Sequence, residues 1–414
     1  MWCGMLVGWM VWSSDTLYLS LAAAEARFLQ KNLLLIAKRL DIQAERALVL
    51  QARLWPNPTI SLDQMDVFTQ AEAPIPPWLS TPRVNQLAFT LSQLVLTAGK
   101  RLKGVALAEA AVAVQEAALG ELLRQLRYNL YTTLYSLQRD QILMGVFERQ
   151  SQLLRQLADR YRQLSAQGLA PLPEYLRIEN LYLQVQADLR EVRQRWEESQ
   201  MALRELLRPE PFSAILWIDT TGFWQPPLPE VGELDSLLLK VYRRGDVRVA
   251  EAQLRLQQSA LAVEKALAYP DVAVNVSMDR LGGYRPNQWG VGVALPLPLF
   301  NRNQGRIQAA RYALEAAQVR YEQTVVTAQS EVIGAWRKLL YLRRQWEEIS
   351  PDLLERYQRS EALYRENLLA SRINFLTYVD FFQSYRDLIT RLVETRYLIH
   401  QTLNELRYAV GVVE

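Results

Sequence analysis

The chain alternates long stretches of helical hydrophobic periodicity with short segments in which apolar and polar residues alternate one by one. Residues 100–166 contain no proline and are dense in Ala, Leu, Arg, Gln and Glu, which have high helix propensity. We predict one continuous helix there, roughly 100 Å long at about 1.5 Å per residue. The same criteria predict further helices over about 17–54, 173–207, 305–370 with a bend at Pro351, and 374–408.

The longest predicted helix carries a stripe of leucines at spacings of three and four residues, with Arg124, Arg127 and Gln138 off that line. The stripe consists of Leu122, Leu126, Leu130, Leu134 and Leu137. Such spacing is typical of a coiled-coil seam. Helices this long cannot bury their apolar faces within a compact globule, so we expect a bundle, a coiled coil or a repeat array.

Four short segments have the period of two that is typical of a strand with one apolar face. They lie at about 272–278, 289–295, 87–91 and, more weakly, 60–62, and small or polar residues such as Asn275 fill the alternate positions. A strand of about ten residues with one apolar face also suits a membrane-spanning β-barrel. Because a closed barrel needs about eight strands, these four either form a small soluble sheet or are pooled by several chains.

The two halves of the chain share one order of predicted elements, which indicates an internal repeat. Residues 168–177 and 371–380 both mark a break between two helices, at an offset of 203 (371 − 168). We divide the chain into a signal segment (1–14), a first repeat (15–208), a linker or equatorial segment (209–245) and a second repeat (246–414). The strand pairs lie at about 57–98 and 270–300, and the helical turns near 165–172 and 368–374.

The N-terminus carries an uncharged apolar run over residues 2–12. This run is shorter than the roughly 20 residues of a bilayer-spanning helix, and it fits the apolar core of a signal peptide that lacks its basic flank. We interpret 1–14 as a short or truncated signal peptide. The alternatives are a disordered apolar tail and lipid attachment at Cys3, although no lipobox precedes that residue. We expect no membrane-spanning helix anywhere in the chain.

The composition argues against sites built from cysteine and histidine, since Cys3 and His400 are the one cysteine and the one histidine in 414 residues. A zinc site of Cys and His needs about four ligands, and a disulfide needs two cysteines. We therefore expect no enzyme activity, no cofactor and no metal site, and we interpret His400 as a packing or surface residue. The net charge of +3 is small for this length, so we expect no nucleic-acid partner.

Several motifs together resemble the TolC family of outer-membrane efflux channels, especially its CzcC-like heavy-metal branch. They are LWPNPTISL (54–62), LSQLVLTAGKRLKG (91–104), ALPLPLFNRNQGRI (294–307) and the two helical breaks. The resemblance extends from about residue 17 to 411. Two positions depart from the family pattern, namely Leu94 in place of the usual proline and Ser371 in place of the usual glycine.

The resemblance implies a mainly helical fold with a small β part, in which three protomers build one channel. Each protomer would supply four strands to an outer-membrane β-barrel and its helices to a long periplasmic α-helical barrel. The implied partners are two further copies of the chain, a periplasmic adaptor (membrane fusion protein), an inner-membrane pump of RND or ABC type, and outer-membrane lipid. In the turn at 301–305, Asn and Gly would tolerate left-handed backbone and cap the next helix.

The resemblance also implies roles for particular residues. The residues that would face lipid are Val272, Val274, Trp289 and Val291. Those that would face the lumen are Asn275, Ser277, Asp279 and Gln288. The helical tips that meet the adaptor would include Ser165, Gly168, Leu169, Ala370, Ser371 and Arg372. A gate at the periplasmic end would use acidic side chains, for which the candidates are Glu174, Asp188 and Asp380.

The expected function is thus passive conduction of substrates through an outer-membrane channel, gated at the periplasmic end of its helical barrel. The alternative is a soluble, duplicated coiled-coil scaffold whose strands form a small capping sheet. The lipid-facing band distinguishes these two classes, because only the channel requires it.

Overall fold

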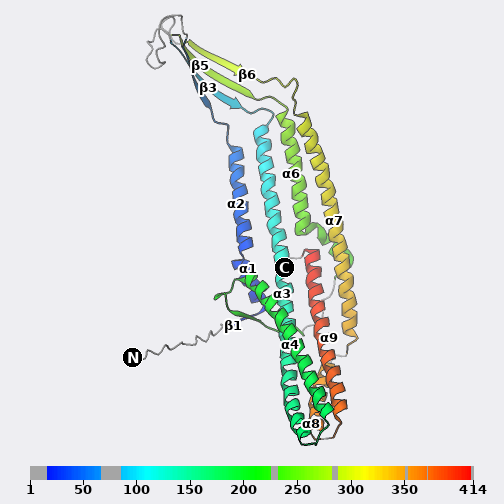
Figure 1. The fold of residues 1–414 in the computed structure, drawn as a ribbon. Coiled ribbons are helices and arrows are strands. Elements are labelled where there is room, and N and C mark those ends of the chain that lie inside the picture. The colour runs from blue at the N-terminus through cyan, green and yellow to red at the C-terminus, as the bar shows by residue number, and fades with distance from the viewer. Residues whose placement is uncertain are drawn as a thin grey trace, which may run out of the picture. The chain divides into compact units, whose positions relative to one another are not determined.

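The computed structural model describes residues 16–66, 85–224, 232–281, 288–349, 353–370 and 372–411. The described chain is mainly helical (Figure 1), as the sequence predicts. It divides into two compact units. Unit 1 draws on 1–37, 120–245 and 325–414, and unit 2 on 38–119 and 246–324. Each unit therefore combines residues from both halves of the sequence.

The elements follow one another along the chain with long helices on either side of short strand pairs. In order they are β1 (Thr16–Leu19), α1 (Leu21–Lys31), α2 (Leu33–Arg53), β2 (Thr59–Asp66), β3 (Asn85–Val95), α3 (Lys100–Ala166), α4 (Leu172–Leu207), β4 (Ile215–Ile218), α5 (Leu234–Lys240), the short 3₁₀ helix Val241–Arg243, α6 (Gly245–Leu267), β5 (Val272–Leu281), β6 (Gln288–Ala294), α7 (Gln304–Glu347), α8 (Leu353–Leu369) and α9 (Phe375–Val410).

The helices α3, α4 and α9 have the predicted extents within two residues, but two predicted helices are divided. The segment 17–54 forms β1, α1 and α2, because Asn32 interrupts it. The Asn32 Oδ1 accepts hydrogen bonds from the backbone N–H groups of Leu34 (3.1 Å) and Leu35 (3.2 Å), which starts α2 as a new helix. Likewise 305–370 is not one bent helix, since α7 ends at Glu347 and α8 begins at Leu353.

Unit 1 is built around the buried faces of α3, α4, α8 and α9. Leu130, Leu134 and Leu137 are fully buried, so the predicted leucine stripe does form a packing seam. The polar residues off that stripe are not all solvated, because Arg124 and Gln138 are also buried. Buried polar groups need partners, and Gln138 finds one by donating to the backbone carbonyl of Asp219 at 2.5 Å.

Strands β1 and β4 form a two-stranded parallel sheet in unit 1. The free edge of β4 is occupied by two glutamine side chains that imitate a neighbouring strand. The Gln200 amide donates to the Leu216 carbonyl (2.5 Å) and accepts from its N–H (3.0 Å). The Gln141 amide, in the orientation that satisfies both of its atoms, makes the equivalent pair with Ile218 at 3.1 and 3.2 Å.

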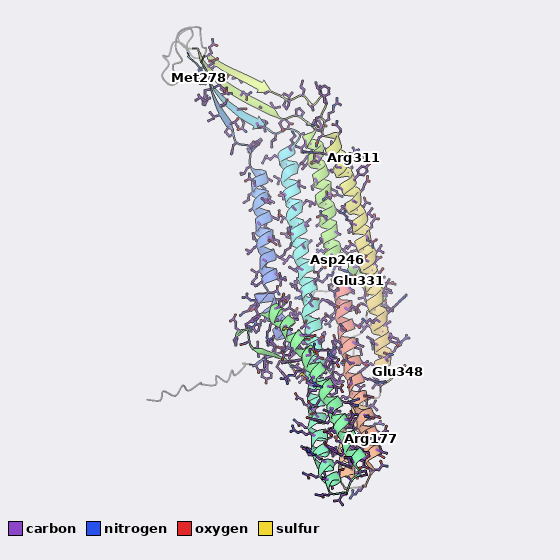
Figure 2. The ribbon with its side chains drawn as sticks, in the orientation of Figure 1. Arg177, Asp246, Met278, Arg311, Glu331 and Glu348 are labelled. Carbon is purple, nitrogen blue, oxygen red and sulfur yellow. The ribbon has the colours of Figure 1, made fainter. Side chains whose placement is uncertain are left out.

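Two arginines hold the C-terminal end of α9 within unit 1. Arg124 donates to the Tyr408 carbonyl at 2.6 Å and lies over the Tyr408 ring, with 3.7 Å between the guanidinium carbon and the ring centre. Arg244, which is 2% exposed, donates to the Ala409 carbonyl at 3.1 Å. It also forms a 2.5 Å ion pair with Glu331, which is labelled on α7 in Figure 2. Cations at these carbonyls complement the helix dipole.

Unit 2 contains a four-stranded sheet in the order β2-β3-β5-β6 with antiparallel neighbours. Four helical segments lead away from the ends of these strands, contributed by α2, α3, α6 and α7 (Figure 1). Exposed ion pairs join α2 to α3, such as Arg46–Glu116 at 2.6 Å and Arg53–Glu109 at 2.9 Å. The sheet thus combines one strand pair from each half of the sequence.

Candidate functional site: an apolar sheet face and two helical turns

The strand register brings apolar side chains of all four strands into common rows across one face of the sheet. This follows from the period of two, because one-residue slippage of any strand would move its apolar set to the other face. Met278, which belongs to this face by its register, is labelled on the sheet in Figure 2. The two rows are Ile60–Leu91–Val276–Val291 and Leu62–Phe89–Met278–Trp289.

This apolar face is largely uncovered. Val291 is 81% exposed, Trp289 72% and Ile60 66%. A water-soluble protein seldom exposes so continuous an apolar surface unless it contacts a partner or a membrane. The residues predicted to face lipid, Val272 and Val274 on β5 and Trp289 and Val291 on β6, all share this face by their register.

The opposite face of the sheet carries small and polar side chains in matching rows. The residues expected to face a lumen, Asn275, Ser277, Asp279 and Gln288, lie in these rows. Gly290 lies opposite Ser277, and a β-carbon at Gly290 would come within 2.9 Å of the Ser277 Oγ. The rows are Thr59–Ser92–Asn275–Gly292, Ser61–Thr90–Ser277–Gly290 and Asp63–Ala88–Asp279–Gln288.

Lys100 fixes the junction where β3 passes into α3. Its ammonium forms a 2.7 Å ion pair with Asp271 and donates to the Tyr269 carbonyl at 2.7 Å. Asp271 in turn accepts from the Thr97 N–H at 2.9 Å. The chain turns here through two residues of left-handed backbone, Ala98 (φ 53°) and Gly99 (φ 69°). This pair, in which Lys100 is buried and Asp271 is half-buried, ties the first strand pair to the start of β5.

Asn303 fixes the corresponding junction between β6 and α7. It has the left-handed backbone that the sequence predicts for this turn (φ 59°), and α7 starts at the next residue. Its side-chain amide donates to the backbone carbonyl (2.8 Å) and to the carboxylate (2.6 Å) of Glu264 at the end of α6. Its N–H donates to the Asn301 Oδ1 at 3.1 Å. The turn therefore acts through local geometry and needs no ligand.

The turn after α3 is closed by a Schellman motif with Gly168 in left-handed backbone (φ 73°). The Leu169 N–H donates to the Leu164 carbonyl at 2.8 Å, and the Gly168 N–H to the Ser165 carbonyl at 3.0 Å. The turn after α8 has the equivalent bond, because the Arg372 N–H donates to the Asn367 carbonyl at 2.8 Å. The donors of these two equivalent hydrogen bonds, Leu169 and Arg372, are 203 residues apart (372 − 169), which is the offset seen in the sequence.

The described residues predicted for the helical tips therefore lie in or beside two turns that share one equivalent hydrogen bond. Ser165 and Ala370 are at the ends of α3 and α8, and Leu169 and Arg372 follow the two turns. Ser371 lies outside the described residues. Leu169 is 71% exposed and Leu172, which begins α4, is 58% exposed. Sequence reasoning included Leu169 among the tip residues and missed Leu172.

The structure does not bring the three gate candidates together. Glu174 lies in the first turn of α4, where a negative charge complements the helix dipole. Asp380 is exposed on α9. Asp188 lies 3.6 Å from the Arg386 guanidinium across α4 and α9, and burial raises the pKa of its carboxyl against the effect of Arg386. No hydrogen bond or ion pair joins these three described residues.

The sequence did not reveal a buried ionic group that includes Arg195, which lines the same groove as Asp188. Asp140 of α3 is fully buried and pairs with Arg139 (2.9 Å) and with Arg195 of α4 (3.6 Å). Burial raises the pKa of Asp140, and the two guanidinium groups oppose this rise. Arg139 also lies 3.8 Å from Glu394 of α9. A groove of about 450 Å³ next to this group is lined by charged residues of α4 and α9.

His400 is a packing residue, as the sequence analysis expects. Its Nε2 lies 3.0 Å from the Phe223 carbonyl, and its ring stacks on Tyr135 with 5.0 Å between ring centres. Arg396 donates to the same carbonyl at 3.0 Å. Burial lowers the pKa of His400, and Arg396 and Arg407 lower it further, while the Phe223 hydrogen bond opposes them.

We expect acidification to weaken unit 1 through His400. Its folded pKa lies below the unfolded value of about 6.5, so this contribution to stability is full above pH 6.5 and is lost as pH falls through the folded pKa. The loss is at most about 1.4 kcal/mol per pH unit. Urea unfolding of wild type and His400→Gln should give free energies that converge as the pH falls from 7 to 5. Parallel curves for the two proteins would contradict this assignment.

Among the described residues, none of the helices is both long and apolar enough to cross a bilayer. The same residues contain no group of three or more His, Cys, Asp or Glu side chains arranged to hold a metal ion.

Comparison with known proteins supports the resemblance drawn from the motifs. Residues 241–412 match the family model described as outer membrane efflux protein. The cobalt-zinc-cadmium resistance protein CzcC of Cupriavidus metallidurans is 26% identical over 134 residues, which is 32% of this chain and 32% of that protein. This match thus spans about a third of the length of the curated relative.

Solved structures share the fold over almost the whole chain. Crystal structures of CusC, described in terms of transmembrane channel formation, superpose with a TM-score of 0.73 at 16% identity over 97% of this chain and 94% of that one. The outer membrane protein VceC of Vibrio cholerae superposes with a TM-score of 0.72 at 17% identity, and the match covers 94% of this chain and 96% of VceC. These matches support the expected family, and the solved structures show that the chain shares their fold.

Proposed function

We propose that this relative of the outer membrane efflux proteins works as the outer-membrane channel of an export system. The observation that carries the proposal is the exposed apolar face of the four-stranded sheet, with small and polar residues in register on the other face. Lipid on one side and water on the other is the environment that such a sheet fits.

The sheet of one chain is not sufficient for a channel, so we propose that three copies assemble. Strands β2 and β6 are the two edges of the sheet, and their outward backbone groups lack a strand partner within the described chain. In lipid each such group costs several kcal/mol unless it is paired, about 2–7 by transfer estimates. Pairing β6 of one copy with β2 of the next would close a barrel, and three copies would supply twelve strands.

In this assembly the long helices continue the channel on the periplasmic side, and the turns after α3 and α8 contact the adaptor of a tripartite pump. The proposal rests on the exposed Leu169 and Leu172 beside a rigid turn. Apolar side chains on a preorganised backbone bind with little loss of conformational entropy. The domain boundaries drawn from the repeat, at 208 and 245, are part of the same proposal.

For gating we propose Asp188 and leave Glu174 and Asp380 as weaker candidates. Asp188 faces Arg386 across α4 and α9 in the charged groove, so separation of these two helices would break the pair. The pair spans two helices, whereas Glu174 complements its own helix and Asp380 is exposed. The cargo class is suggested by the relatives, whose names assign them to cobalt, zinc, cadmium and nickel resistance.

Conduction and docking can be tested separately with Leu169→Asp. We expect purified wild type and Leu169→Asp to give the same stepwise conductance in planar bilayers, because the turn is remote in sequence from the strands. In a deletion strain of the source bacterium, Leu169→Asp should fail to restore metal resistance, because a charge replaces the apolar docking contact.

The matched control is Leu183→Asp, which changes a similarly exposed leucine (58%) on α4 away from the turn. It should conduct and restore resistance. Absence of any conductance from the wild-type protein, together with its recovery as a soluble monomer, would overturn the channel proposal in favour of the scaffold alternative. Equal resistance with Leu169→Asp and Leu183→Asp would remove the docking role alone.

A further inference from the structure

A polar cavity in unit 1 has no place in conduction, docking or gating as argued above. It has a volume of about 340 Å³ and lies among α3, α8 and α9. Its lining includes Arg149 and Gln150 of α3, Glu361 and Arg365 of α8, and Tyr385 of α9. Phe382 forms an apolar wall. The size is within the range of small-molecule sites, about 300–1,000 Å³.

Gln150 is the unusual member of this lining. It is only 6% exposed, and neither its amide nitrogen nor its amide oxygen has a hydrogen-bond partner among the described residues. The Glu361 Oε1 is also buried without a partner. An unpaired buried polar group costs about 1–3 kcal/mol, so two of them at one cavity favour the presence of a hydrogen-bonding group there.

The charges that face the cavity define the complementary ligand. Arg149 and Arg365 present guanidinium donors, and neither has an ion-pair partner in the described chain. The Gln150 oxygen and Glu361 instead require hydrogen-bond donors. Glu361 and burial together raise the pKa of Tyr385, while Arg149 lowers it, which is consistent with both charges lying near this phenol.

We propose that this cavity binds a small carboxylate that also carries a hydrogen-bond donor, as in an amino acid or a hydroxy acid. The carboxylate accepts from Arg149 and Arg365, and the donor group binds the Gln150 oxygen and Glu361. Phe382 and Tyr385 cover the carbon skeleton. Planar guanidinium groups recognise carboxylates through paired hydrogen bonds, and the net positive lining favours an anion over a metal cation.

The ligand joins three helices of unit 1, so its binding should stabilise this unit by mass action. Arg149 and Gln150 belong to α3, Glu361 and Arg365 to α8, and Tyr385 to α9. This coupling gives a readout that does not depend on channel activity. If the cavity binds no ligand, the proposed channel function is unaffected, because neither the sheet nor the turns contribute to the cavity.

The test uses the purified full chain in detergent with three probes: L-glutamate, L-malate and acetate. We expect glutamate or malate to raise the thermal unfolding midpoint and to bind in equilibrium dialysis, and acetate, which has no donor group, to bind at least tenfold more weakly. Tighter binding of glutamate than of malate would identify an ammonium group as the donor. Tighter binding of malate would identify a hydroxyl group. Equal binding of acetate would overturn the donor requirement, and no binding of any probe would overturn the site.

Two variants locate the site. Arg365→Gln should weaken binding at least tenfold, whereas Arg359→Gln, an arginine of the same helix paired with Glu355 outside the cavity, should bind as wild type does. Gln150→Leu should raise the unfolding midpoint without any probe and abolish the rise that a probe produces, because it removes the unpaired amide. Unchanged binding in both Arg365→Gln and Gln150→Leu would place the probe elsewhere and overturn the proposal.

Discussion

Val276→Arg should prevent the chain from accumulating in the outer membrane. Val276 lies in the second inner strand of the sheet, in the apolar row between Leu91 and Val291. On the lipid face of a barrel strand an arginine costs about 2–4 kcal/mol near the bilayer midplane. If three copies assemble, each barrel bears that cost three times. We expect the amount of protein recovered in outer-membrane fractions to fall at least tenfold.

The control for this variant is Asn275→Arg, at the adjacent position of the same strand. Asn275 lies in the polar row with Thr59, Ser92 and Gly292, so its arginine would project to the other face of the sheet. This variant should accumulate in the membrane and alter the conductance or ion selectivity of the channel. If both variants accumulate equally, the apolar face does not contact lipid, and a soluble sheet becomes the better interpretation.

Arg244→Ala should lower the free energy of unfolding of unit 1 by about 3 kcal/mol, within the range for removal of one partner of a buried ionic and hydrogen-bonded group. The variant leaves the Ala409 carbonyl without the 3.1 Å donor and Glu331 without its 2.5 Å ion pair. Arg244 also lies close to Gly411, whose backbone is left-handed (φ 76°): a β-carbon at Gly411 would come within 3.0 Å of the Arg244 Cα.

Arg243→Ala is the matched control, since Arg243 is the adjacent arginine and is exposed. It removes the same charge from the chain without removing a buried contact, and its effect should stay within about 0.5 kcal/mol, as for most surface substitutions. Urea unfolding of both variants in detergent measures the difference. Similar losses in the two proteins would mean that charge, and not the contact at the end of α9, accounts for the effect.

The long elements and the sheet could be predicted from the sequence because their patterns are long and regular. Helix α3 begins and ends where the helix-favouring composition does, at Lys100 and Ala166. The period of two assigned the strands to a common apolar face before their register was known. Asn303 adopts the left-handed backbone expected for its turn, because few residues other than Asn and Gly do so at low cost.

The remaining features depend on contacts between segments that are distant in sequence. Strands β1 and β4 have four residues each, too few for a period to be recognised, and they form because they pair with one another. Asn32 ends one helix and starts another within a sequence that favours helix throughout, so only its capping bonds reveal the break. Arg124, Asp140 and Arg244 resemble ordinary surface charges until the packed structure shows their burial.

The glutamine side chains beside β4 have a consequence for how this chain avoids aggregation. A two-stranded sheet normally offers two open flanks onto which another extended segment can add, which makes it a template for misassembly. Gln141 and Gln200 already occupy the hydrogen-bonding groups of Leu216 and Ile218 on one flank. Strand β4 is therefore closed on that side to an added strand from another molecule, which removes one of the two edges at which this small sheet could misassemble.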